Sequence, residues 1–242
     1  MWALKGKNTM SANPRKYLNE ARAASKSKDY AKALSRYEYF FDHALDDDRA
    51  SFYGVRLSYC LDEWAELGEV YPLAKERLIQ RRDGCLDLLI QEKDPEFFHD
   101  YIAICGYLKC SNLPIEAFKN LHLENEELAS EIVRFIWDDL VSNSLWEVCL
   151  HYLPDPHAKY RQCISKHDSL VKMKNENPDM GGKGYQKQMN SWAVRDIGNI
   201  LLVLKNNNRM GAYTNILGKA ESDFGERGQN DLFLRIREKV AL

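Results

Sequence analysis

The sequence predicts an all-α fold built from antiparallel helix pairs. Apolar residues recur at intervals of three and four from residue 14 to the C-terminus, which is the period of a helix buried along one face. We find no run of alternating β-branched residues, which would indicate a strand. The breaks between the periodic stretches are mostly short, as expected for helices that pack as antiparallel neighbours.

The first two helices are predicted within residues 14–45. Pro14 suits the first turn of a helix, where its missing N–H would have no partner in any case. The polar break "SKSKD" then separates two stretches whose apolar residues share a face. The second stretch carries Tyr30, Ala33, Leu34, Tyr37, Phe41 and Leu45. Residues 1–13 are expected to form a flexible N-terminal segment.

Proline and glycine divide the next part of the chain. The helix "SFYGVRLSYCLDEWAEL" is expected to end at Gly68, because glycine adopts the left-handed cap conformation easily. Pro72 and Pro95 should each begin a helix, and Pro114 should open a short segment. A long helix then follows, with Leu128, Ile132, Phe135, Ile136 and Leu140 on one face.

The C-terminal half continues the helical pattern less regularly. "SLWEVCLHYL" is a helical run that the prolines of "PDP" stop, and a polar helix is predicted over 157–174. The stretch 191–204 is amphipathic, with Val194, Ile197, Leu201 and Leu204 aligned. Two last helices are predicted near 210–224 and 229–241. The whole chain should hold roughly ten to twelve helices.

Small and aromatic residues occupy particular places in the first helix pair. Tyr17 and Ala21 lie in the first helix, and Tyr30, Ala33 and Tyr37 follow in the second. Small residues let helix axes approach, and aromatic rings fill the adjoining holes. In this pattern residues 14–45 resemble a tetratricopeptide repeat, a helix pair of about 34 residues.

A second, weaker unit with this resemblance begins near residue 54. "WAELGEVYPLAKERL" carries Trp64, Leu67, Gly68, Tyr71 and Ala74, with one extra residue between Gly68 and Ala74, and Leu61 stands where the family prefers a small residue. The resemblance implies a tetratricopeptide-like α-solenoid, with units at about 14–48 and 54–91. We predict that these units and the irregular helices of 95–242 form a single domain over 14–242.

The resemblance also implies a function: such helix pairs hold a concave surface for a partner segment. We therefore predict a non-enzymatic protein-interaction module or adaptor. In the family pattern the inner face of the first helix would carry Leu18, Ser25 and three cations: Arg15, Arg22 and Lys26. Those cations would suit an acidic partner or a C-terminal carboxylate. The alternative interpretation is a solvated basic face.

A metal-binding protein or an enzyme with a site near 147–167 is a second hypothesis. "CLHYLPDPHAKYRQCISKH" contains Cys149, His151, His157, Cys163 and His167. Zinc accepts a mixed nitrogen and sulfur shell, and Cys163 and His167 are four residues apart. No closely spaced ligand pair is present, however, so packed or surface side chains are the competing interpretation.

Two further motifs are weaker. Glu96 and His99 form one Glu-x-x-His, half of a di-iron signature, and we interpret them as a surface pair on an early helical turn. "GGKGYQK" is rich in glycine and lysine but lacks the spacing of a phosphate loop, so a flexible connector is predicted.

Charge and cysteine content limit the remaining classes of function. Residues 115–155 hold nine acids against two bases, and residues 159–209 hold ten bases against four acids. The two blocks could attract each other, and a nucleic-acid-binding helical repeat is the third hypothesis. The formal net charge is −2, and no apolar run reaches the roughly 20 residues that span a bilayer. We predict a cytoplasmic protein with six reduced cysteines and no cofactor.

Overall fold

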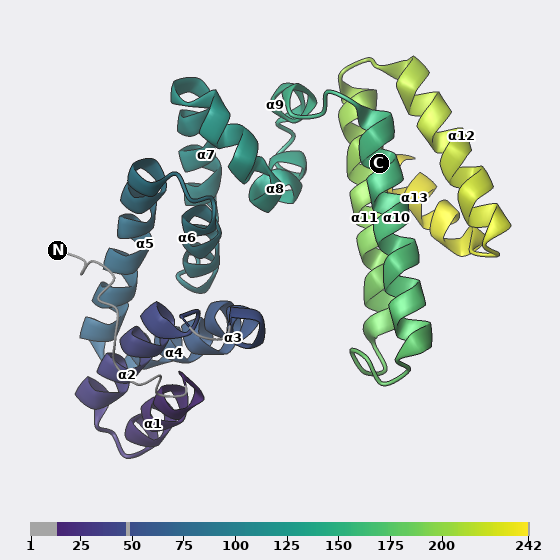
Figure 1. Cartoon of the computed structure of the whole chain (residues 1–242). Helices are drawn as coiled ribbons and strands as arrows, with labels where there is room; N and C mark the ends of the chain where they lie inside the picture. Colours follow the sequence, from purple (N-terminus) through teal and green to yellow (C-terminus); the bar gives the residue numbers. More distant parts are fainter. Residues whose placement is uncertain (1–13, 47–48, 242) are drawn as a thin grey trace. The chain divides into compact units, whose positions relative to one another are not determined.

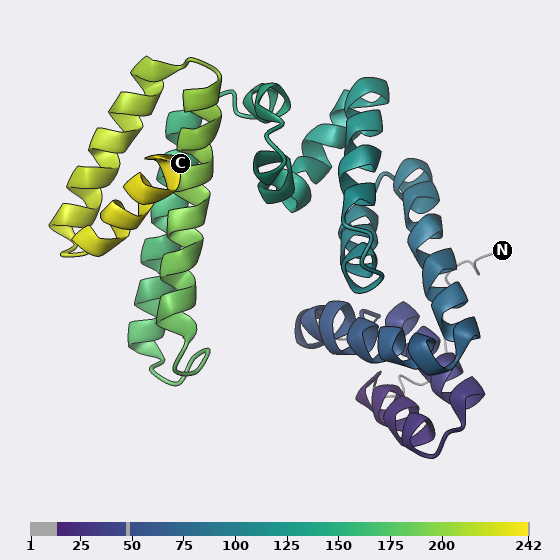
Figure 2. The same cartoon turned by 180° about the vertical axis from the view of Figure 1, so that it is seen from behind.

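The computed structural model describes residues 14–46 and 49–241, so the predicted flexible segment 1–13 lies outside the described residues. The described chain is 84% helical and contains no strand, which confirms the all-α prediction. It divides into two compact units, residues 1–135 and residues 136–242. The division falls inside α8 (Glu126–Ser142) rather than at a linker. Figures 1 and 2 show the helices from two opposite sides. Whether the two units fold as one domain stays a prediction.

Unit 1 contains neighbouring helices that pack on one another in chain order. Its elements are α1 (Pro14–Lys26), α2 (Tyr30–His43), α3 (Arg49–Val55), the π-helical turn η1 (Arg56–Cys60), α4 (Leu61–Val70), α5 (Pro72–Glu92), α6 (Glu96–Tyr107), α7 (Asn112–Glu124) and the first part of α8 (Glu126–Ser142). α1 packs on α2, α4 on α5, and α5 on α6. Stacked pairs of this kind are compatible with a helical repeat.

The first helix pair matches the prediction closely. α1 begins at Pro14, and the carboxylate of Asp29 caps α2 by accepting a hydrogen bond from the Lys32 N–H. Ala21 and Ala33 are both fully buried, and the helices that carry them pack against each other. Small side chains therefore lie where the two helices approach.

Gly68 does not end its helix as predicted. α4 continues to Val70, and Tyr71 is its C-cap. A Cβ atom on Gly68 would lie 3.0 Å from the Lys75 Cβ and 3.2 Å from the Lys75 Cα, so the glycine permits close approach of α5. Trp64 reinforces the same contact, because its indole N–H donates to the Ala74 carbonyl at 2.9 Å. The expected short segment at Pro114 is also a full helix, α7.

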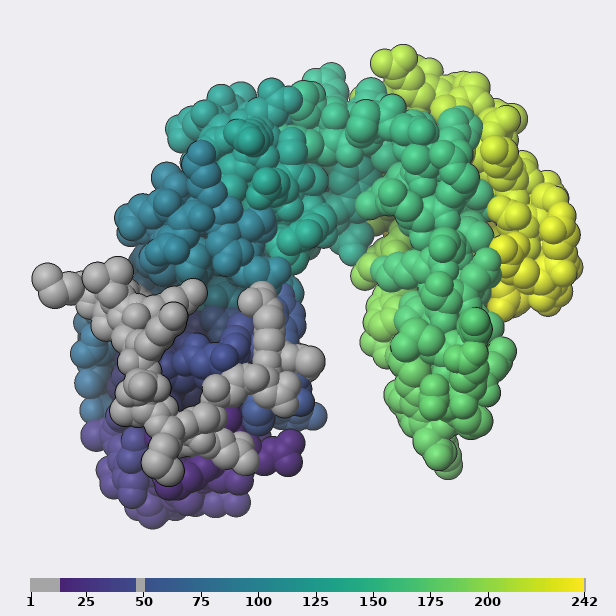
Figure 3. Space-filling model, viewed as in Figure 1, coloured from purple at the N-terminus to yellow at the C-terminus, as the bar shows by residue number. Residues whose placement is uncertain are grey.

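Unit 2 contains the rest of α8 and five further helices. These are α9 (Trp146–His151), α10 (Pro156–Glu176), α11 (Tyr185–Asn206), α12 (Met210–Glu226) and α13 (Asn230–Ala241). α11 is the central helix, since α10, α12 and α13 all pack on it. Its buried residues include Ile197, Ile200 and Leu201. α10 and α11 form the long hairpin drawn in green in Figure 3.

The turn between α10 and α11 is hydrogen-bonded, and the flexible connector expected there stays a prediction. The Lys174 ammonium donates to the carbonyls of Pro178 at 2.5 Å and Met180 at 2.7 Å. Gly181 has a φ of +69°, and a Cβ there would lie 2.4 Å from the Tyr185 ring. The glycine is required by this turn rather than by a phosphate.

Candidate partner-binding surface

The predicted partner contacts lie on α1, and the opposite side of this helix packs in the core. Leu18 is only 3% exposed, and Ala21 and Ala24 are buried with it. The expectation that Leu18 shares a partner-facing surface with the cations is therefore wrong. Its apolar side chain packs inside unit 1, whereas Arg15 and Lys26 are exposed.

Arg22 is engaged inside the protein. Its Nε lies 2.9 Å from both carboxylate oxygens of Glu63 on α4, and its Nη2 lies 2.6 Å from Oε1. The Tyr37 hydroxyl also donates to Glu63, at 3.3 Å. The hydrogen bond to Glu63 raises the pKa of Arg22, and burial raises the pKa of Tyr37. Arg22 thus ties α1 to α4, so a partner carboxylate would have to compete with Glu63.

A shallow groove runs along the exposed side of α1. It is lined by Arg15, Lys16, Asn19, Glu20 and Ala23. Glu20 is held from across the helix pair by Arg36, with Nε 2.9 Å from its carboxylate. Lys26 stands in the last turn of α1, eleven residues after Arg15. At 1.5 Å per residue, the two cations are separated by about 16 Å along the helix axis.

A second polar cluster joins α3, α6 and α8. The Tyr53 hydroxyl donates to the Glu96 carboxylate at 2.5 Å and lies 2.6 Å from the His99 Nδ1. The His99 ring stacks on Phe135 with the ring centroids 4.7 Å apart. Burial lowers the pKa of His99, against the influence of Glu96.

This cluster corrects the interpretation of Glu96 and His99 as a simple surface pair. Each side chain is half-buried and meets Tyr53, which comes more than 40 positions earlier in the chain. Sequence spacing gives no signal for such a contact. The sequence showed only the Glu-x-x-His spacing, which identified Glu96 and His99 but not Tyr53.

The candidate metal ligands of 147–167 are spread over two helices. Cys149 and His151 belong to α9, whereas His157, Cys163 and His167 belong to α10. Burial raises the pKa of the Cys149 thiol to about 12 and that of the Cys163 thiol to about 11. Across residues 14–46 and 49–241, no group of three or more His, Cys, Asp or Glu side chains is arranged to hold a metal ion.

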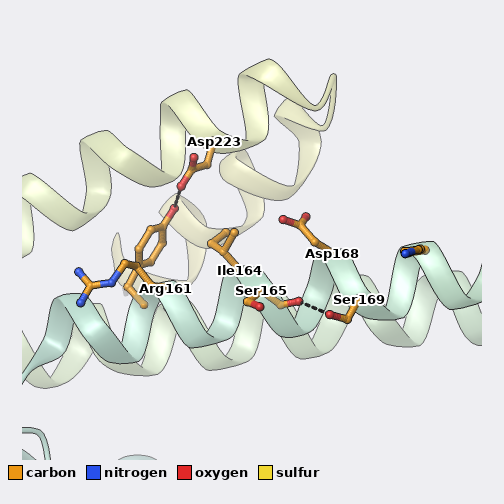
Figure 4. Close-up of a pocket in the computed structure, with 8 residues that line it drawn as sticks. Arg161, Ile164, Ser165, Asp168, Ser169 and Asp223 are labelled. Atoms are coloured by element: carbon orange, nitrogen blue, oxygen red, sulfur yellow. Dashed lines mark hydrogen bonds between the residues drawn. The ribbon is translucent and has the colours of Figure 1, made fainter.

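A groove in unit 2 lies between α10 and α12 (Figure 4). The Tyr160 hydroxyl closes one side by donating to the Asp223 carboxylate at 2.6 Å. Arg227 holds Asp168 with two hydrogen bonds, at 2.9 and 2.8 Å. The Ser169 hydroxyl donates to the backbone carbonyl of Ser165, so it is not directed at a general base.

Part of the basic block of 159–209 is engaged by carboxylates or backbone carbonyls within unit 2. Arg195 pairs with Asp138 of the acidic block at 3.0 Å and with Asp196 at 2.7 Å. Lys166 also meets Asp196, and Lys205 donates to the Val240 carbonyl. The predicted attraction between the two charge blocks is therefore found at Arg195.

No protein-family model, curated protein or solved structure matches this chain. Within its described part, no helix combines the length and the apolar character needed to cross a membrane. The six cysteines are free thiols, as predicted.

Proposed function

We propose that this protein is a non-enzymatic interaction module that binds an acidic segment of a partner protein along α1. The observation that carries the proposal is the groove on α1, which places Arg15 and Lys16 beside Asn19 on the side away from the core, with Lys16 3.8 Å from the Glu20 carboxylate. Lys26 extends the cationic surface to the last turn of the same helix. Ammonium and guanidinium groups form their strongest hydrogen bonds with carboxylates.

The fixed position of α1 supports this proposal. The helix is packed through Leu18, Ala21 and Ala24, and Arg22 clamps it to Glu63. A surface that is already ordered loses little conformational entropy when a partner binds. Arg22 accordingly has a positioning role, and Arg15, Lys16 and Lys26 make the contacts.

The arrangement of unit 2 favours a protein partner over nucleic acid. A nucleic-acid-binding surface requires cations that are available to phosphates. In unit 2 four of the cations are engaged by carboxylates or backbone carbonyls: Lys166, Lys174, Arg195 and Lys205. The separation of the cysteines and histidines between α9 and α10 likewise favours packing over metal chemistry.

A displayed random-peptide library, panned against the full chain, tests the proposal across all peptide chemistries at once. We expect enrichment of acidic peptides. In fluorescence anisotropy the combined change Arg15→Ala, Lys16→Ala and Lys26→Ala should weaken their binding about tenfold, since each exposed pair contributes about 0.5 kcal/mol. The salt dependence of binding should flatten in the same variant.

A matched control removes three cations from unit 2: Lys159→Ala, Lys187→Ala and Lys219→Ala. All three side chains are exposed, so the change in net charge is the same. The control should bind the acidic peptides like the parent. Equal losses in both variants would mean that net charge alone attracts the peptides, which would contradict a site on α1.

A further inference from the structure

Cys105 and Cys110 meet where α6 ends. Leu108 is the C-cap of the helix, and Lys109 follows with a left-handed φ of 57°. The Cys110 N–H donates to the Cys105 carbonyl at 2.9 Å, and the Lys109 N–H donates to the Gly106 carbonyl at 3.2 Å. These are the two hydrogen bonds of a Schellman motif, which brings the side chains at these two positions together. In most proteins that contact is between apolar side chains, and here it is between two thiols.

The two thiols have different surroundings. Cys105 is completely buried, whereas Cys110 is partly exposed. The Cys110 thiol donates to the Cys105 carbonyl oxygen, with the Sγ 3.5 Å from that oxygen. Arg82 of α5 places its Nη1 3.6 Å from the Cys110 Sγ. The same guanidinium donates from its Nε to the Asp83 carboxylate at 2.8 Å.

The other four cysteines lack this combination. Their side chains are buried, and burial raises the thiol pKa of each: Cys60, Cys85, Cys149 and Cys163. Burial also raises the pKa of Cys105 to about 12, so this thiol keeps its proton at neutral pH. Cys110 is therefore the cysteine that an oxidant can reach.

We propose that Cys110 and Cys105 form a redox-active thiol pair that hydroperoxides convert into an intramolecular disulfide. Cys110 is the thiol that attacks the peroxide, and Cys105 is the resolving thiol. The pair lies at the junction of α6 and α7. The inference is independent of the partner site on α1.

The chemistry requires one molecule of hydrogen peroxide. The Cys110 thiolate attacks one peroxide oxygen, the O–O bond breaks, and the released hydroxide takes up a proton to become water. The resulting sulfenic sulfur is attacked by the Cys105 sulfur, which forms the S–S bond. Hydroxide leaves from Cys110 and takes the Cys105 proton as a second water. Two electrons pass from the two sulfurs to the peroxide, and a dithiol reductant reverses the step.

The sequence makes this disulfide easy to detect. Trypsin cleaves after Lys93, Lys109 and Lys119, so Cys105 falls in peptide 94–109 and Cys110 in peptide 110–119. Reduced full-length protein is treated with hydrogen peroxide, remaining thiols are blocked with N-ethylmaleimide, and the digest is analysed by mass spectrometry. We expect peptides 94–109 and 110–119 to become joined before Cys60, Cys149 or Cys163 is oxidised.

Two serine variants separate the roles of the thiols. In Cys105→Ser the sulfenic acid on Cys110 should persist and be trapped by dimedone. In Cys110→Ser peroxide should leave Cys105 reduced, because that thiol is buried. Circular dichroism spectra matching the parent identify variants that have kept the fold.

Three results would overturn the inference. The first is that both thiols remain open to N-ethylmaleimide under conditions that oxidise free glutathione. The second is a disulfide between peptides 83–93 and 94–109, which would make Cys85 the partner of Cys105. The third is a disulfide that forms only between two protein molecules, seen as a dimer on a non-reducing gel.

Discussion

The buried ion pair between Arg56 and Asp100 is the contact whose removal should damage unit 1 most. Arg56 lies in η1, and its Nη1 and Nη2 each lie 2.5 Å from one carboxylate oxygen of Asp100 on α6. Each side chain is 10% exposed. The Arg56 Nε donates to the Phe41 carbonyl at 2.7 Å, and the guanidinium lies 3.8 Å from the centre of the Phe41 ring. One side chain therefore links α2, η1 and α6.

Asp100→Asn removes the negative charge with almost no change of shape. The Arg56 cation would remain buried without a counter-charge, and breaking a buried pair in this way costs about 3–5 kcal/mol. Since native proteins are stable by about 5–15 kcal/mol, that loss is a large fraction of the total. For a chain of this size the melting temperature should fall by about 10 °C.

Urea unfolding, followed by circular dichroism at 222 nm, measures this loss directly. The double variant Arg56→Met, Asp100→Leu should be closer to the parent than either single variant, because it buries no charge. Glu116→Gln is the control: it breaks an exposed pair with Lys119 and should cost less than about 0.5 kcal/mol. If the free energy of unfolding of Asp100→Asn lies within about 1 kcal/mol of the parent value, the ion pair is not desolvated and the argument fails.

Three other predictions follow from packing and titration. Ala33→Leu should lower the free energy of unfolding by about 1–3 kcal/mol through overpacking, and a parent-like urea midpoint would refute close approach of α1 and α2 at that site. Gly68→Ala should lower the free energy of unfolding, because the new Cβ would meet Lys75. Gly54→Ala should raise the free energy of unfolding by up to about 1 kcal/mol, because nothing lies within 4 Å of its new Cβ. Equal effects of the two changes would contradict the close contact of α4 and α5. The lowered pKa of His99 means that the unfolded chain binds more protons near pH 6, so the free energy of unfolding should fall as the pH drops through the unfolded-state pKa of about 6.5. His99→Gln should remove that part of the pH dependence, and an unchanged slope would show that His99 does not cause it.

Local signals in the sequence were sufficient for most helix boundaries. Pro14 begins α1 and Pro72 begins α5, because each acts through its own backbone. The small residues Ala21 and Ala33 are buried, as their spacing predicted. These features depend on interactions that short stretches of sequence contain.

Features that depend on contacts between distant residues were not predictable. Gly68 was predicted to end a helix, because the sequence alone does not distinguish a glycine that caps a helix from one that lets Lys75 of the next helix pack closely. The π-helical turn η1 ahead of Leu61 likewise had no signal in the sequence. Such turns often accompany functional or strained sites, and here the turn contains Arg56.

The candidate partner site was predictable only in part. Helical spacing correctly placed Arg15, Arg22 and Lys26 on one helix. Helical spacing did not reveal that the Arg22 guanidinium would be hydrogen-bonded to Glu63, 41 residues later in the chain. Cys105 and Cys110 were likewise recognisable only as separate apolar positions, because their contact requires the left-handed Lys109.

Site-specific photo-crosslinking from the α1 groove tests the central claim most directly. Ala23 is exposed and lines the groove, so p-benzoylphenylalanine at that position would sit beside a bound segment. The same group at Lys187 in unit 2 serves as the control. After irradiation in the native lysate, mass spectrometry should find an acidic peptide of one partner protein joined to position 23 and absent from position 187, and its yield should fall when Arg15, Lys16 and Lys26 are replaced by alanine. Identical adducts at both positions would contradict partner binding along α1. A crosslinking yield that is unchanged when the three cations are replaced would contradict it as well.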